Sequence, residues 1–151
     1  MKFDHSNLKE LMKQALEEAQ KSLPVDVPVG AVIVDRAGSL IGRGYNRREK
    51  NQQTCDHAEI LALREANTLS KNWRLNRATL VVTLEPCLMC AGAILQSRIE
   101  RVVFGASDPH GEGLLTLKLS SKPQIIAGVL EAECQGLLQE FFGNRRAQPE
   151  S

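Results

Sequence analysis

Apolar residues recur at helical spacing near the start of the chain and again near its end. The first set predicts a helix over residues 8–22. Asn7, followed three residues later by Glu10, is a suitable helix start, and Pro24 ends the pattern. The second set predicts a helix over residues 131–142. Its apolar face consists of Cys134, Leu137, Leu138 and Phe141.

Short apolar segments elsewhere in the chain predict strands. The longest is a nearly continuous run rich in Val and Ile, which is typical of a strand buried on both faces. It is followed by a turn at 35–38 and a second apolar segment, as in a hairpin. The expected strands cover residues 27–34, 39–44, 78–84, 101–105 and 124–127.

Two further helices are predicted between these strands. After a polar loop at 46–55, Asp56 is a good N-cap for a helix over residues 57–69. Pro86 suits the first turn of a helix that reaches about residue 97. Strands that alternate with helices favour an α/β fold of three layers (α/β/α), with helices on both faces of a five-stranded mixed sheet.

Composition narrows the class of protein. The chain has 151 residues, the size of one domain, and we expect residues 1–151 to form a single unit. The net charge of +1 gives no argument for a polyanionic partner, so such a partner would need local clusters of basic residues. No apolar stretch approaches the ~20 residues of a membrane span, and the N-terminus lacks the apolar core of a signal peptide. We therefore expect a cytoplasmic protein whose four cysteines are thiols or metal ligands.

Two short motifs at the starts of predicted helices carry the chemistry. His57 and Glu59 open one helix, and Cys87 and Cys90 open the next, three residues apart and therefore on one face. The positive end of a helix dipole favours thiolates, which bind soft divalent metals together with an imidazole. Three protein ligands are typical of a catalytic zinc site that leaves a fourth position for water. A carboxylate beside that water can move its proton.

Each motif alone has a plainer interpretation. A single Cys-x-x-Cys is also a redox pair or half of a structural zinc site. Glu59 could be the last residue of a capping box that starts at Asp56. The combination of both motifs, separated by one strand, favours a zinc-dependent hydrolytic site.

The His-x-Glu and Pro-Cys-x-x-Cys motifs are the established signature of zinc nucleobase deaminases, and here the chain resembles the cytidine deaminase superfamily. Over residues 8–146 it resembles, more narrowly, the bacterial tRNA-specific adenosine deaminase family. The segments that carry this resemblance are Pro28–Val32, Gly44–Arg47, His57–Ile60, Leu84–Ile94, Ser97–Ile99, Arg101–Ala106, Phe141–Phe142 and Arg145–Arg146.

The resemblance implies a cytidine deaminase-like fold, one Zn²⁺ per subunit and a homodimer. It implies hydrolytic deamination of adenosine to inosine at the wobble position of a tRNA anticodon, with release of ammonia. The zinc ligands would be His57, Cys87 and Cys90, and Glu59 would carry protons. The substrate contacts would be Asn46, Val29, Ala58, Leu84, Pro86 and Asp108.

Two segments depart from the family pattern. The loop at 109–123 is shorter than usual, and the tail at 145–151 is less basic. Both segments would contact RNA, so a free nucleobase or nucleoside deaminase (of guanine or cytosine) is the alternative. A zinc module that binds RNA without catalysis is a third class, which Glu59 disfavours. The basic residues just before the first motif would form a rim if they share the pocket side, and are otherwise solvated surface: Arg43, Arg47, Arg48 and Lys50.

Overall fold

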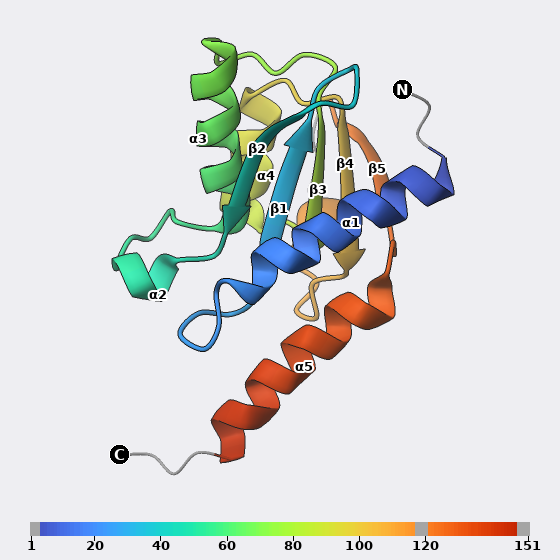
Figure 1. Ribbon diagram of the computed structural model, residues 1–151. Helices are drawn as coiled ribbons and strands as arrows, with labels where there is room; N and C mark the ends of the chain where they lie inside the picture. Colours follow the sequence, from blue (N-terminus) through green and yellow to red (C-terminus); the bar gives the residue numbers. More distant parts are fainter. Residues whose placement is uncertain (1–3, 117–120, 148–151) are drawn as a thin grey trace.

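The computed structural model describes residues 4–116 and 121–147 (Figure 1). Its elements follow the predicted order of helices and strands, with a short helix and a single 3-10 turn added. In chain order they are α1 (His5–Gln20), β1 (Gly30–Val34), β2 (Leu40–Tyr45), α2 (Arg48–Asn51), α3 (Ala58–Ser70), β3 (Thr79–Leu84), α4 (Leu88–Gln96), β4 (Arg101–Ala106), η1 (Leu114–Thr116), β5 (Gln124–Ala127) and α5 (Glu131–Ala147).

The five strands form one mixed sheet in the order β2-β1-β3-β4-β5. β1 pairs antiparallel with both β2 and β3, whereas β4 is parallel to β3 and to β5. β3 is therefore central, and its carboxyl end leads directly into the segment before α4. The predicted five-stranded mixed sheet is confirmed.

Helices cover both faces of the sheet, which confirms the predicted three layers. α3 and α4 pack on one face, and α1 and α5 lie on the other (Figure 1). Every residue of β1 is buried, which explains why its sequence is a continuous apolar run rather than an alternation. α3 packs directly on β2. The two elements approach so closely at Gly44 that a Cβ there would overlap the backbone of Ala58 and Ala62. This close approach fixes the start of α3 relative to the end of β2.

The first and last helices differ from their predicted limits. α1 begins at His5, and its N-cap is Asp4, whose side chain accepts a hydrogen bond from the backbone N–H of Asn7 at 2.9 Å. The predicted start at Asn7 is therefore wrong by one turn. α5 continues beyond residue 142, and near its end Arg145 Nη2 donates to the carbonyl of Val25 at 2.8 Å. This contact reaches 120 residues back along the chain, so local periodicity could not reveal it.

The two helices that carry the motifs begin later than predicted. The N-cap of α3 is His57 rather than Asp56, whose carboxylate instead accepts a hydrogen bond from Asn51 Nδ2 at 2.8 Å. The N-cap of α4 is Cys87, so Pro86 lies before the helix and not in its first turn. In both helices a metal-ligand candidate occupies the residue at which the backbone turns into the helix.

α2 lies in the segment expected to be a loop, and no prediction anticipated it. Its four residues have no apolar periodicity, so tertiary contacts must stabilise it. The atypical 109–123 loop is described up to residue 116 and from residue 121, and the tail up to residue 147; residues 117–120 and 148–151 lie outside the description. Among the described helices, none is long and apolar enough to cross a membrane.

Candidate metal centre and active site

The predicted metal ligands meet at the adjoining starts of α3 and α4. His57 is the N-cap of α3, Cys87 is the N-cap of α4, and Cys90 lies in the first turn of α4. His57 Nδ1 lies 3.6 Å from the sulfur of Cys87 and 3.5 Å from that of Cys90. Tetrahedral zinc, with bonds of about 2.3 Å to sulfur and about 2.0 Å to nitrogen, requires a sulfur–nitrogen separation of about 3.5 Å. The donor set therefore fits zinc.

The charges of these groups also favour a bound cation. Hydrogen bonds from Cys90 and His57 lower the pKa of Cys87 to about 3, so Cys87 is a thiolate at neutral pH. The pKa of Cys90 is raised by the hydrogen bond that Cys90 makes with Cys87 and by the burial of Cys90. The Cys87 hydrogen bond raises the pKa of His57 as well. The trio thus retains protons that a divalent cation would displace, as expected of a thiolate–imidazole metal site.

Glu59 lies in the first turn of α3 with 4% of its surface exposed. The capping-box interpretation of this residue is wrong, because Asp56 is not the N-cap. Burial raises the pKa of Glu59, and nearby His57 partly opposes that shift. A carboxyl group beside a metal site is suited to accept a proton and to donate it again, and a raised pKa strengthens it as a base.

A cavity of about 170 Å³ opens beside these groups. Four of the six predicted substrate contacts line it together with the motif residues, so the structure brings together side chains that are far apart in sequence. The lining residues are Val27, Val29, Asn46, Arg48, His57, Ala58, Glu59, Leu84, Glu85 and Cys87.

Asn46 already uses part of its hydrogen-bonding capacity. Its Nδ2 donates to the carbonyl of Val27 at 3.1 Å, and its Oδ1 accepts from the backbone N–H of Arg48 at 3.2 Å. An amide group has two donor hydrogens and two acceptor lone pairs, so one of each remains for a ligand. The side chain is 7% exposed and held in place, which suits it to recognise a flat polar molecule in the cavity.

The other two predicted contacts, Pro86 and Asp108, do not line this cavity. The carbonyl of Pro86 accepts a hydrogen bond from the N–H of Leu114 at 3.0 Å. The carboxylate of Asp108 accepts from the N–H groups of His110 at 2.9 Å and Glu112 at 3.3 Å, within its own loop. Contact of either residue with a substrate stays a prediction.

Three residues of the cavity were missed by the sequence analysis as site residues: Val27, Arg48 and Glu85. Arg48 belongs to the cluster of basic residues that precedes the His-x-Glu motif. Glu85 directly precedes the Pro-Cys-x-x-Cys motif, and its buried carboxylate accepts the N–H groups of Asp108 and Leu115, each at 2.9 Å. A charged residue at the end of a buried strand was the available signal.

Residues 5–106 match the family described as the cytidine and deoxycytidylate deaminase zinc-binding region. The tRNA-specific adenosine deaminase of Bacillus subtilis (strain 168) is 46% identical over 143 residues, which cover 89% of this chain and 88% of that protein. The tRNA-specific adenosine deaminase of Streptococcus pyogenes serotype M1 is 44% identical over 143 residues, covering 89% of this chain and 83% of that protein. A solved structure from a study of A-to-I editing by tRNA:A34 deaminases has a TM-score of 0.78 and 36% identity, covering 85% of this chain and 99% of that chain.

Proposed function

The chain belongs to the cytidine and deoxycytidylate deaminase family, and we propose that it converts adenosine to inosine at the wobble position of a tRNA anticodon. The reaction is hydrolytic and releases ammonia. The observation that carries the proposal is the cavity lined by His57 and Cys87 of the His57–Cys87–Cys90 cluster and by Glu59. It is supported by the similarity of the chain to two tRNA-specific adenosine deaminases.

His57, Cys87 and Cys90 would hold one Zn²⁺ per chain. When bound, zinc lowers the pKa of a water molecule and so supplies a nucleophile near neutral pH. Two thiolate ligands donate much charge to the metal, which weakens this effect compared with neutral imidazole ligands. A neighbouring base is therefore needed, and Glu59 lines the same cavity as His57 and Cys87.

Glu59 moves the protons of the reaction. As its carboxylate, it takes a proton from the attacking water. Attack at C6 of adenine places negative charge on the neighbouring ring nitrogen, and Glu59 gives the proton to that nitrogen. Glu59 then takes the second proton from the new hydroxyl group and gives it to the amino group, which leaves as ammonia while the C6 carbonyl forms. Burial raises the pKa of Glu59, which makes its carboxylate a stronger base toward the water proton.

The remaining cavity residues orient the base. Val29 and Leu84 offer apolar surfaces for the two faces of a purine ring, and the remaining donor and acceptor of Asn46 bind its polar edge. Ala58 lies in the first turn of α3, where backbone N–H groups point out of the helix. A base buried in this cavity must leave the stacked anticodon loop, so the RNA substrate enters with one nucleotide flipped out.

We also propose that residues 1–151 act as one domain, in the cytoplasm, as a homodimer. Support for the dimer comes from large apolar side chains that remain exposed on and beside α3 and α4: Leu69 is 64% exposed, Trp73 52% and Leu88 66%. Light scattering should give the mass of two chains, and Leu88→Lys should lower it toward one. A single-chain mass for the unmodified protein contradicts the dimer.

The function is tested with zinc-loaded protein on a panel of substrates. The panel contains tRNA anticodon stem-loops with adenosine at the wobble position, free adenosine, guanine and cytosine. We expect inosine in the RNA, and we expect Glu59→Gln to abolish turnover while zinc content stays unchanged. Turnover of a free base without any on RNA would support the alternative of a nucleobase deaminase. Loss of zinc in Glu59→Gln would contradict the proton-carrying role.

A further inference from the structure

Two segments that are distant in sequence form one wall of the cavity, and hydrogen bonds tie them together. The first, residues 22–29, precedes β1, and the second, residues 46–50, follows β2. Ser22 Oγ donates to the carbonyl of Asn46 at 2.9 Å, and the N–H of Asn46 donates to the carbonyl of Val29 at 2.9 Å. Asn46 Nδ2 adds the bond to Val27. The wall is therefore a clamped pair of segments rather than a free loop.

Asp26 completes this clamp from within the first segment. It is 2% exposed, and both of its carboxylate oxygens accept backbone hydrogens from α2: Oδ1 from Glu49 at 2.7 Å and Oδ2 from Lys50 at 3.1 Å. A buried carboxylate that accepts two N–H groups at a helix start caps that helix and stabilises it. Asp26 thus provides the tertiary contact that α2 requires.

The turn that Asp26 caps presents Arg48 to the cavity. Arg48 lines the cavity together with Val27 and Asn46. Its guanidinium is half exposed and lies 3.9 Å from Glu49 Oε1, the limit of an ion pair. Such a distant, exposed pair contributes little and leaves the guanidinium available to another anion.

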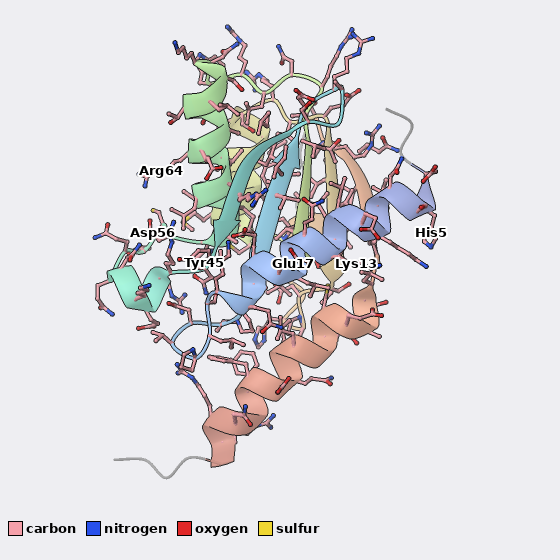
Figure 2. All side chains as sticks on the ribbon, viewed as in Figure 1. His5, Lys13, Glu17, Tyr45, Asp56 and Arg64 are labelled. Atoms are coloured by element: carbon pink, nitrogen blue, oxygen red, sulfur yellow. The ribbon has the colours of Figure 1, made fainter. Side chains whose placement is uncertain are left out.

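The surroundings of Arg48 are basic. The Arg47 guanidinium stacks over the Tyr45 ring at 4.7 Å. Lys21 Nζ lies 6.0 Å from the same ring but is paired with Glu18 Oε1 at 2.8 Å. Tyr45 lies beside α2, where β2 ends (Figure 2). Since the carboxylate of Asp26 is buried against backbone hydrogens, it does not neutralise Arg47 or Arg48 at the surface. This end of the sheet therefore combines a cavity for a base with a cationic rim.

We propose that Arg48 is a specificity-determining residue that binds a backbone phosphate next to the flipped nucleotide, and that Asp26 is the positioning residue that holds Arg48 there. The inference rests on the proposed function and deepens it, because it names the feature by which this cavity prefers a polynucleotide over a free base. A planar guanidinium binds phosphate oxygens through two parallel hydrogen bonds, and such a contact depends on a fixed backbone behind it.

The test compares two anticodon stem-loops: one natural, and one with neutral methylphosphonate linkages on both sides of the target adenosine. On natural RNA, Arg48→Gln should lower kcat/KM about tenfold, mainly through KM, and should reduce the salt dependence by about one phosphate contact. On the neutral substrate, the kcat/KM of Arg48→Gln should lie within about twofold of that of the unmodified protein. An equal loss on both substrates would overturn the role of Arg48.

The matched control is Arg77→Gln. Arg77 is exposed and precedes β3, so it lies at the opposite end of that strand from the cavity residue Leu84. Arg77→Gln should leave kcat/KM and its salt dependence unchanged on natural RNA. A tenfold loss in this variant as well would show that general positive charge, and not the placement of Arg48, decides binding, and would contradict the proposal.

The positioning role of Asp26 is tested by non-additivity. Asp26→Asn keeps one acceptor, so it should raise KM severalfold on natural RNA and speed amide hydrogen exchange at Glu49 and Lys50. In an Arg48→Gln background it should change KM little further, because its effect passes through Arg48. Fully additive losses, or a loss in kcat with unchanged KM, would contradict the role. If Asp26→Asn does not accumulate in folded form, Asp26→Ser takes its place in the same comparison.

Failure of the inference is distinguishable from failure of the proposed function. If the unmodified protein deaminates no RNA, the proposed function itself is wrong. If it deaminates natural and neutral-linkage RNA equally well, the function stands and the phosphate contact of Arg48 is wrong.

Discussion

Glu85→Gln tests how the loop after β4 is attached to the site. The carboxylate of Glu85 accepts the N–H groups of Asp108 and Leu115, each at 2.9 Å, from a position that is 6% exposed. Gln has the same shape but only one oxygen, so one N–H would face an NH₂ group. The loss of a hydrogen bond to a charged group costs about 1.5–3 kcal/mol, and an unpaired buried N–H adds to this cost. Partial movement of the loop limits the total to about 2–4 kcal/mol.

Urea unfolding of the zinc-loaded protein measures this difference. For a chain of this size, with a slope of about 2 kcal/mol per molar urea, the midpoint should fall by about 1–2 M. Glu100→Gln is the control, because Glu100 is exposed and its substitution should change stability by less than about 0.5 kcal/mol. Leu114 lies in the same loop and is fully buried in the core on the α3–α4 side of the sheet. Its N–H donates to the carbonyl of Pro86, so this N–H should exchange with solvent faster when the loop is loosened in Glu85→Gln. A midpoint that matches that of Glu100→Gln would refute the reasoning.

Three further outcomes are expected. Gly44→Ala should lower stability by about 1–3 kcal/mol or more in thermal unfolding, because the added Cβ overlaps the backbone of Ala58 and Ala62; a variant as stable as the unmodified protein would contradict that packing. Cys90→Ala should bind no stoichiometric zinc by metal analysis, whereas a variant of the exposed cysteine, Cys55→Ala, should keep one zinc per chain; equal metal content in both would contradict the ligand set. Burial raises the pKa of the Cys134 thiol to about 12. As pH rises above about 8.5, the thiol therefore loses its proton in the unfolded chain before it does so in the folded protein, and stability falls between about pH 8.5 and 12. Between pH 8 and about 10.5, the free energy of unfolding measured in urea should fall by about 2–3 kcal/mol more for the unmodified protein than for Cys134→Ala. Parallel falls of the unfolding free energy with pH in the two proteins would contradict this account.

Much of the site could be predicted from the sequence because its signals are local. His57, Cys87 and Cys90 each lie at the start of a helix, and the spacing of the cysteines alone places both sulfurs on one side of the first turn. Asn46 directly follows a strand, next to a recognisable motif. For these residues, a short stretch of chain decides both the backbone conformation and the direction of the side chain.

The features that could not be predicted depend on contacts between distant segments. Asp26 caps a helix that begins 22 positions later in the chain, and Glu85 binds N–H groups 23 and 30 residues away. α2 exists because of such a contact, since its own sequence is polar and lacks periodicity. The N-caps were misplaced at Asn7 and Asp56 for a related reason: several adjacent polar residues can cap a helix, and packing selects one of them.

The central claim is hydrolytic deamination of an adenosine within tRNA. The most direct test is a reaction of zinc-loaded protein with an anticodon stem-loop in ¹⁸O-labelled water, followed by mass spectrometry of the nucleotides. The account predicts inosine at the wobble position only, with the heavy oxygen in its base and an equal amount of ammonia released. Unchanged RNA, in a sample whose zinc is stoichiometric and which deaminates free guanine or cytosine, would contradict it.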